Sequence, residues 1–206
     1  ALLLQPAWAA EPPDIVIDPG GVGPQSLQAI TGAVDAITRL AQDQDGGEVT
    51  RLRRRARDAT VSALETQGYF SSRVDLIVGQ DILGETWDIT IEPGPRTDVR
   101  KVDLGFQGKI SAPEFAARVD VLKEEWPLDE GMPFINEQWS QAKTALLDEV
   151  SRKDFLLAKI SHSQATIEAA QAKADLSVQV DSGPQVRMGK LRLIGLKRVP
   201  ESLIER

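Results

Sequence analysis

The sequence predicts an α+β fold made of tandem two-layer modules, each with two helices packed on a three-stranded mixed sheet. Three observations support this prediction. Segments that alternate apolar and polar residues are separated by pairs of segments with helical spacing, in the order strand, helix, helix, strand, strand. This order runs through twice and starts a third time. The passages that close the first two cycles are alike: ITIEPGPRTDVRKVDLGFQG at 89–108 and VQVDSGPQVRMGKLRLIGLK at 178–197.

The first cycle opens with a short alternating strand that Pro-Gly-Gly ends. Two helices follow, each with apolar residues on one face, and Gly68 is placed to end the second helix in a left-handed conformation. In the last strand Trp87, Ile89 and Ile91 alternate with polar residues, which is typical of a sheet with one wet face. We expect these elements at 13–21, 25–42, 48–67, 72–79 and 86–92.

The second cycle repeats the order. Asn136 is expected to be the N-cap of its second helix, because its side chain can accept from the first free amides. Trp139 lies in the apolar stripe of that helix, so we expect it in the core. Phe70 of the first cycle is matched to Phe155 of the second, 85 residues later. We expect the elements of this cycle at 100–106, 112–122, 137–150, 154–168 and 174–180.

Gly94-Pro95 and Gly183-Pro184 stand 89 residues apart, where each module passes to the next. They leave almost no linker, so neighbouring modules are expected to touch. A third cycle starts with the alternating run GKLRLIGL, which indicates a piece of a longer protein. The expected divisions are a signal-peptide remnant at 1–10, a first module at 11–96, a second at 97–185 and the start of a third at 186–206.

The composition argues against several classes of function. The net charge of −7 and the aromatic fraction of 5% do not suit a nucleic-acid binder, which needs positive surface and stacking rings. The absence of cysteine rules out thiol catalysis, thiolate metal sites and disulfides. A single histidine, His162, argues against a Ser-His-Asp triad. We therefore expect no cofactor, no metal site, no catalytic residues and no nucleic-acid partner.

The first residues, ALLLQPAWAAEPP, read as the end of a secretory signal. An apolar run is followed by Ala7-Trp8-Ala9, and small residues at these two positions are what signal peptidase accepts. A disordered apolar N-terminus is the alternative interpretation. No other stretch approaches the length of about 20 apolar residues that a membrane-spanning helix needs.

Taken together, these features resemble the POTRA (polypeptide-transport-associated) domains that precede the outer-membrane barrel in the BamA/TamA superfamily, and within it the TamA-like branch. The resemblance covers residues 12–206. Its strongest passages are TWDITIEPGPRTDVRKVDLGFQG at 86–108, EGMPFINEQWSQAKTALLDEV at 130–150 and ADLSVQVDSGPQVRMGKLRLIGLKRVP at 174–200.

The resemblance implies a periplasmic scaffold of a Gram-negative outer-membrane protein, not an enzyme. It implies assistance to the insertion of outer-membrane proteins such as autotransporters. The implied partners are a TamB-like protein anchored in the inner membrane, unfolded outer-membrane clients and phospholipid. The POTRA region of BamA or of a two-partner secretion transporter is the close alternative. A soluble periplasmic enzyme that uses carboxylates is the alternative from another class.

The strand after the second helix of each module would be a sheet edge, where an extended client can add as a further strand. An edge covered by loops or by a neighbouring module is the alternative. The candidate residues are Val74, Asp75, Leu76, Ile77 and Val78 in module one and Ser161, His162, Ser163, Gln164, Ala165, Thr166 and Ile167 in module two.

The segment RLRRRAR forms a second candidate site, a basic patch for an acidic partner or lipid phosphates. A solvated helix face is the alternative interpretation. Successive helical residues lie about 100° apart, so these arginines fan across the outer side of the helix. They are Arg51, Arg53, Arg54, Arg55 and Arg57.

Other polar groups have simpler interpretations. His162 lies between two serines, but neighbouring residues of a strand point to opposite faces and do not form a nucleophile–base pair. Asp43, Asp45 and Glu48 lack the ligand count of a calcium loop. The pair Glu124-Glu125 is expected at a helix end rather than at a catalytic centre.

Overall fold

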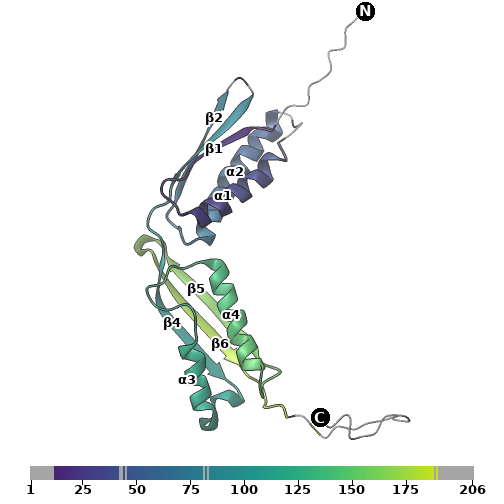
Figure 1. Ribbon diagram of the computed structural model, residues 1–206, viewed down its shortest axis with the longest axis vertical. Coiled ribbons are helices and arrows are strands. Elements are labelled where there is room, and N and C mark those ends of the chain that lie inside the picture. Colours follow the sequence, from purple (N-terminus) through teal and green to yellow (C-terminus); the bar gives the residue numbers. More distant parts are fainter. Residues whose placement is uncertain are drawn as a thin grey trace, which may run out of the picture.

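The computed structural model describes residues 12–41, 44, 46–80, 82, 84–187 and 189. It contains two α+β modules arranged end to end, each with its helices on one face of its own sheet (Figure 1). Within the described ranges, no helix is long and apolar enough to span a membrane. The predicted signal-peptide end at 1–10, the residues Asp43 and Asp45, and the predicted third cycle beyond Arg187, apart from Gly189, lie outside the described residues.

Module one has the predicted order of elements. Its sheet has the strand order β1-β3-β2, with β1 parallel and β2 antiparallel to the central β3. The first helix ends four residues earlier than predicted, and the second starts two residues earlier. All three strands lie where the alternation of residues predicts them. The elements are β1 (Asp14–Asp18), α1 (Pro24–Thr38), α2 (Gly46–Thr66), β2 (Arg73–Gln80) and β3 (Glu85–Glu92).

Module two repeats this architecture with the strand order β4-β6-β5. Again the first strand is parallel and the hairpin partner antiparallel to the central strand. Its first helix is shorter, because two 3-10 turns at Lys109–Ser111 and Pro113–Phe115 precede it. The elements are β4 (Asp98–Gln107), α3 (Ala116–Glu124), α4 (Asn136–Ser151), β5 (Lys159–Glu168), a 3-10 turn (Ala169–Gln171) and β6 (Lys173–Asp181).

Each module has its own hydrophobic core, which confirms the predicted two-layer packing. In module one Trp87, Ile89 and Ile91 of β3 are buried under the helices, while the alternate side chains face away. Burying side chains of this size stabilises a fold by about 2 kcal/mol each. The alternation seen in the sequence therefore identifies the inner face of the central strand.

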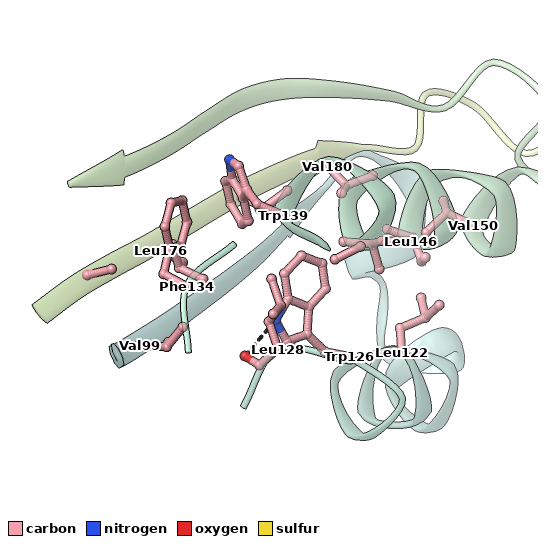
Figure 2. Close-up of a cluster of buried hydrophobic side chains, with 14 of the residues drawn as sticks. Val99, Leu122, Trp126, Leu128, Phe134, Trp139, Leu146, Val150, Leu176 and Val180 are labelled. Atoms are coloured by element: carbon pink, nitrogen blue, oxygen red, sulfur yellow. Dashed lines mark hydrogen bonds between the residues drawn. The ribbon is translucent and has the colours of Figure 1, made fainter. Parts of the chain in front are cut away.

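The core of module two is centred on two tryptophans (Figure 2). Trp139 of α4 and Trp126, which follows α3, meet edge to face with ring centroids 6.0 Å apart. The indole nitrogen of Trp126 donates to the carbonyl of Leu128 at 3.1 Å, so its one polar group is satisfied in the core. Trp139 was predicted in the core; Trp126 was not singled out, because it follows the helical stripe rather than lying in it.

One helix start differs from the prediction. Asn136 is the first residue of α4, not its N-cap, and Ile135 holds the cap position in an extended conformation. The structure gives this cap no side-chain hydrogen bond. The expectation was wrong because residue type alone does not distinguish the cap from the first helical residue.

The joint between the modules is a chain of backbone hydrogen bonds. Thr97 donates its amide to the carbonyl of Gly68 at 2.8 Å, and Phe134 donates its amide to the carbonyl of Thr97 at 2.8 Å. Gly68 has φ of +94°, as predicted for the end of α2, and an added Cβ would lie 2.4 Å from the carbonyl oxygen of Phe134. Glycine is thus required here for both its conformation and its lack of a side chain.

Side chains complete the joint and correct one sequence match. Phe70 packs against the core of module two, where its ring lies 6.0 Å from that of Phe134. Tyr69 packs into module one, and Phe155 is buried in module two's own core. The structural counterpart of Phe155 is therefore Tyr69, and the match of Phe70 with Phe155 was wrong by one residue. The match was displaced by one residue because Tyr69 and Phe70 are both aromatic.

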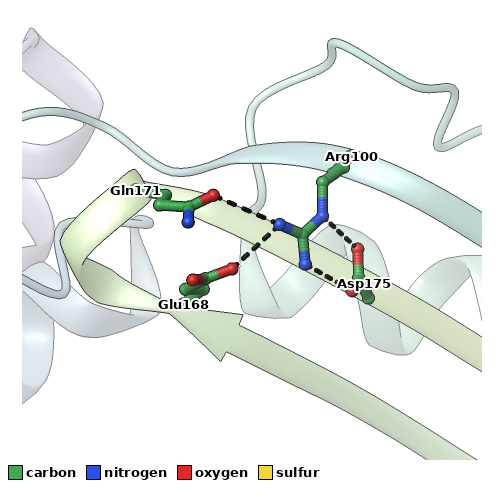
Figure 3. A network of polar contacts seen from close by, with 4 residues as sticks. All are labelled: Arg100, Glu168, Gln171 and Asp175. Atoms are coloured by element: carbon green, nitrogen blue, oxygen red, sulfur yellow. Dashed lines mark hydrogen bonds and ion pairs between the residues drawn. The ribbon is translucent and has the colours of Figure 1, made fainter.

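A polar network fixes the part of module two that module one contacts (Figure 3). Arg100 of β4 donates Nε to Asp175 at 2.8 Å and Nη1 to Glu168 at 2.8 Å. These partners lie on β6 and β5, so one side chain ties all three strands at the end of the hairpin. At the same hairpin turn, the hydroxyl of Ser71 donates to the carbonyl of Ala169 at 2.9 Å.

Candidate partner-binding edges

The strand after the second helix lies at a sheet edge in both modules, as predicted. In module one this strand is β2, which pairs with β3 and with no other strand in the described part of the chain. Val74 is buried at its start, whereas Ile77 is 65% and Val78 42% exposed. The second half of β2 therefore presents apolar side chains to solvent beside a free backbone edge.

The first half of the β2 edge is already occupied by a side chain from α2. Arg57 donates Nε to the carbonyl of Val74 at 2.9 Å. This places the carbonyl of Val74 on the side away from β3, and alternation puts the backbone groups of Leu76 and Val78 on that side too. Of the five candidate residues, Val74 thus has its outward acceptor taken, and the open segment runs from Leu76 to Gln80.

The β5 edge is interrupted near its start. The pairing register with β6 shifts between Ile160 and His162, so Ser161 forms a bulge. The hydroxyl of Ser161 donates to the carbonyl of Gln179 at 3.1 Å on β6. Regular pairing then runs from His162 to Glu168. Because bulges blunt edges, the segment after Ser161 is the better template for an added strand.

The first strand of each module is also an edge, and the sequence analysis did not predict this. The start of β4 is covered by its own module. The amide of Val99 donates to the carbonyl of Met132 at 2.8 Å, and the carbonyl of Val99 accepts from the amide of Gly131 at 2.7 Å. Farther along, a cavity of about 340 Å³ borders β4, lined by Val102, Asp103, Leu104, Lys123, Trp126, Asp129 and Glu130. In this fold the first strand pairs only with the central third strand, which leaves it outermost. The predicted order of elements was therefore the signal from which this second edge could have been found.

The five arginines of the predicted basic patch do not act alike. Arg51 pairs with Glu48 at 3.1 Å, and Arg57 is held on β2. Arg53 forms a bidentate pair with Glu85 at the start of β3. Arg54 and Arg55 are exposed and have no ion pair among the described residues. Three of the five thus make contacts inside module one, and two are exposed with no partner in its described part.

The Arg53–Glu85 pair anchors the β2–β3 hairpin to α2. Burial raises the pKa of the Glu85 carboxyl, but hydrogen bonds from Arg53 and from the Trp87 indole, with the charge of Arg53, outweigh this and lower the pKa overall. Glu85 therefore stays ionised and paired. This contact holds the hairpin that carries the open part of β2, and it explains why Arg53 is not part of a free basic surface.

The polar groups weighed as catalytic candidates are not assembled into a site. Ser161, His162 and Ser163 are all exposed along β5. No group of three His, Cys, Asp or Glu side chains within the described ranges could hold a metal ion. Glu124 and Glu125 lie exposed at the end of α3.

A cavity of about 310 Å³ opens between α3 and α4, with Leu122, Trp126 and Leu146 in its lining. Three carboxylates lie on its rim, those of Glu125, Asp148 and Glu149. Glu149 pairs with Arg152 at 2.7 Å, so one of the three is already engaged. Apart from these carboxylates and Arg152, the residues lining the cavity are apolar, and none of them carries a hydroxyl, thiol or imidazole group.

The fold and its edges define a class of protein: tandem β-α-α-β-β modules in which the third strand is central and the second is open. No protein-family model matches the chain, and a search of curated proteins finds no match either.

Solved structures similar to the chain include POTRA3-5 of BamA from Haemophilus influenzae, with 16% identity, 98% of this chain and 78% of that chain covered, and a TM-score of 0.44. POTRA1-2 of the periplasmic domain of Omp85 from Anabaena has 14% identity, covers 85% of this chain and 96% of that chain, and has a TM-score of 0.41. CdiB from Acinetobacter baumannii has 15% identity, 86% and 30% coverage, and a TM-score of 0.39.

Proposed function

We propose that the chain is the periplasmic POTRA region of a TamA-like outer-membrane protein, which assists the insertion and assembly of outer-membrane proteins such as autotransporters. The observation that carries the proposal is the open strand that follows the second helix in each module. In this role the chain performs no covalent chemistry. It holds clients and partners, and the barrel that would follow it belongs to the same proposal.

Client strands bind by adding to these edges. Backbone amides and carbonyls supply the affinity, so clients of many sequences are accepted. On β2 the segment from Leu76 to Gln80 offers free backbone groups, and Ile77 and Val78 offer apolar contacts for alternate client side chains. On β5 the regular segment after Ser161 serves in the same way. Two edges in one chain allow a client to be passed from one module to the next.

The proposed binding site for the TamB-like partner lies on module one. Arg54 and Arg55 are exposed on the outer side of α2, and neither forms an ion pair with another residue that the structure describes. They suit an acidic segment of such a partner. Phospholipid phosphate would satisfy the same two groups, and a vesicle-binding assay with Arg54 and Arg55 changed to Ser separates lipid from protein as the source of the anion.

Export belongs to the proposal as well. Ala7-Trp8-Ala9 is a signal-peptidase pattern, and it would deliver the chain to the periplasm. Further modules and a barrel would follow the described residues. Division at 11–96, 97–185 and 186–206 remains the proposed domain plan.

Site-specific photo-crosslinking in cells tests the proposal. A photoreactive residue at Ile77 or Ser163 is expected to capture outer-membrane protein precursors, and one at Arg54 a TamB-like protein. The same residue at Val121, which is exposed on α3, is the matched control. Capture of a single secreted client at Ile77 would favour a two-partner secretion transporter instead. Capture of general barrel precursors without a TamB-like protein would favour a BamA-like role. Equal capture at Val121 would contradict edge binding.

A further inference from the structure

Module two ends in a pair of exposed leucines. Leu156 is 62% and Leu157 65% exposed, and they follow α4 along the chain. Helix α4 ends at the end of module two from which the chain leaves (Figure 1). Two adjacent leucines this exposed are an uncommon feature of a soluble surface. The corresponding residues of module one are already in contact with a neighbouring module.

The chain leaves the two modules in the same way. Val186 donates its amide to the carbonyl of Asp154 at 2.7 Å, just as Thr97 donates to Gly68 at 2.8 Å. Asp154 has φ of +71° and Gly68 has φ of +94°, so both acceptors are in the left-handed region that ends the helix. The exit of module two is therefore a second copy of the exit that forms the known joint.

A second pair of contacts fixes the residue equivalence. An added Cβ on Gly94 would lie 3.3 Å from the carbonyl oxygen of Ser71, and one on Gly183 would lie 3.7 Å from that of Leu157. Leu157 thus stands where Ser71 stands, and Leu156 stands where Phe70 stands. Phe70 is the side chain that module one inserts against the core of module two.

The two exits differ in what covers them. Thr97 is 1% exposed, and its carbonyl accepts the amide of Phe134 from the next module at 2.8 Å. Val186, in the same position at the second exit, is only half-buried, and no hydrogen bond to its carbonyl is found among the described residues. Backbone groups and apolar side chains are thus ready at the second exit but uncovered there.

The exit of module two is held in place by its own module. Gln185 donates Nε2 to Asp154 at 3.2 Å, and Asp154 also lies 3.7 Å from Arg118 of α3. At the first exit Arg96 donates Nε to the carbonyl of Gln67 at 3.0 Å in a comparable way. The direction in which the chain departs is therefore set before anything docks.

We propose that Leu156 and Leu157 are the docking surface for a further module of the same fold, joined to module two through Val186 as module two is joined to module one. Leu156 occupies the position equivalent to Phe70. It packs against an apolar loop of that module, which corresponds to the loop that carries Phe134. The carbonyl of Val186 accepts an amide of that loop. The inference rests on the modular plan of the proposed function and not on client binding.

Photo-crosslinking of the full-length natural protein tests this proposal. A photoreactive residue at Leu156 is expected to crosslink within the chain, to residues beyond Arg206 that mass spectrometry locates. The same residue at Phe70 is the positive reference and must reach module two. Crosslinks from Leu156 to another protein, to a second copy or to lipid would overturn the proposal, and so would no crosslink. A crosslink within the chain combined with no client capture at Ile77 would refute only the client-binding role.

Limited proteolysis of the same protein gives an independent readout. Leu156→Asp with Leu157→Asp is expected to speed cleavage near Gln185–Arg187 by roughly tenfold, because burial of a leucine shifts such an opening equilibrium by that order. Val121→Asp, which adds a charge at another exposed apolar position, is the matched control and should leave cleavage unchanged. Unchanged cleavage in the leucine variant, with unfolding of modules one and two unaffected, would reject the docking surface.

Discussion

At the scale of single residues, Arg118 shows how one side chain can finish a helix. It lies on α3, yet it donates to the carbonyls of Glu149, Val150 and Lys153 at 3.1, 3.1 and 2.8 Å. These carbonyls belong to the last turn of α4 and the residues after it, where helical partners run out. The guanidinium also lies 5.2 Å from the ring of Phe155. Arg118 therefore connects both helices to the module core.

Replacing Arg118 with Ala is expected to lower the free energy of unfolding by about 2 kcal/mol, because three carbonyls, two of them partly buried, lose a charged donor. Urea denaturation followed by tryptophan fluorescence measures this, since Trp126 and Trp139 lie in the same core. Arg152→Ala is the control: its pair with Glu149 is exposed and contributes no more than about 0.5 kcal/mol. Equal losses in both variants would show that the capping contacts do not matter.

The Arg100 network gives module two a defined dependence on pH. The hydrogen bond from Arg100 lowers the pKa of Asp175 below its ordinary value of 3.8; partial burial acts in the opposite direction, and the charges of Arg100 and Lys101 lower it further. A carboxyl whose pKa is lower in the folded state stabilises the fold above the unfolded-state pKa. That contribution is lost as the pH falls through the folded-state pKa.

Asp175→Asn is therefore expected to destabilise the protein at neutral pH and to make little difference once the pH is well below 3.8. Urea denaturation of both proteins across this range measures the difference. Asp103→Asn on β4 serves as control, because Asp103 is exposed and has no ion pair among the described residues. A difference that grows as the pH falls would have the wrong sign and would contradict the pairing.

At the scale of elements, the open segment of β2 can be tested without changing its side-chain character much. The backbone amide and carbonyl of Val78 point away from β3, whereas those of Ile77, opposite Asp88, point toward β3 and bond to it. Val78→Pro is expected to remove one outward amide and reduce client crosslinking by about tenfold, with little change in stability. Ile77→Pro removes a ladder amide and is expected to unfold the strand. Undiminished crosslinking in a folded Val78→Pro variant would argue against strand addition.

Two glycines in or next to helices carry opposite expectations. Gly68→Ala places a side chain at φ of +94° and against the carbonyl of Phe134, so we expect a loss of about 2 kcal/mol or more. Gly32→Ala lies in α1 with open space around it and is expected to stabilise by about 0.5–1 kcal/mol. Thermal unfolding of both variants measures the contrast. A stabilised Gly68→Ala would mean that the joint adapts without cost.

The elements themselves were predictable because each has a period. The alternation through Trp87, Ile89 and Ile91 identified β3 and its buried face, and the order of elements identified β2 and β5 as edges. The contacts that modify those edges were not predictable. Arg57 reaches a carbonyl 17 residues away, and the bulge at Ser161 follows no pattern of residue type. Such contacts depend on how a helix lies over a sheet, which periodicity does not contain.

At the scale of the whole molecule, the joint was predicted to be tight but its side chains were misassigned. The residue directly after the left-handed position points into its own module, as Tyr69 and Phe155 do, and the next residue points to the neighbour. Matching Phe70 to Phe155 by type hid this rule. Once the backbone is known, the same rule makes Leu156 the counterpart of Phe70.

The joint between the modules is narrow, so its stability should depend strongly on Phe70. Phe70→Ala removes the ring contact with Phe134, 6.0 Å between centroids, and exposes apolar surface of module two. We expect the amides of Thr97 and Phe134 to exchange with solvent at least about tenfold faster, since opening costs less by more than 1 kcal/mol. Amide exchange followed by NMR measures this. Amides of β6 should be unaffected, and Ile77→Ala, an exposed site away from the joint, should change none of them. If the Thr97 and Phe134 amides exchange at the original rate in Phe70→Ala, the backbone bonds alone hold the modules together, and the same would be expected of any module that docks on Leu156.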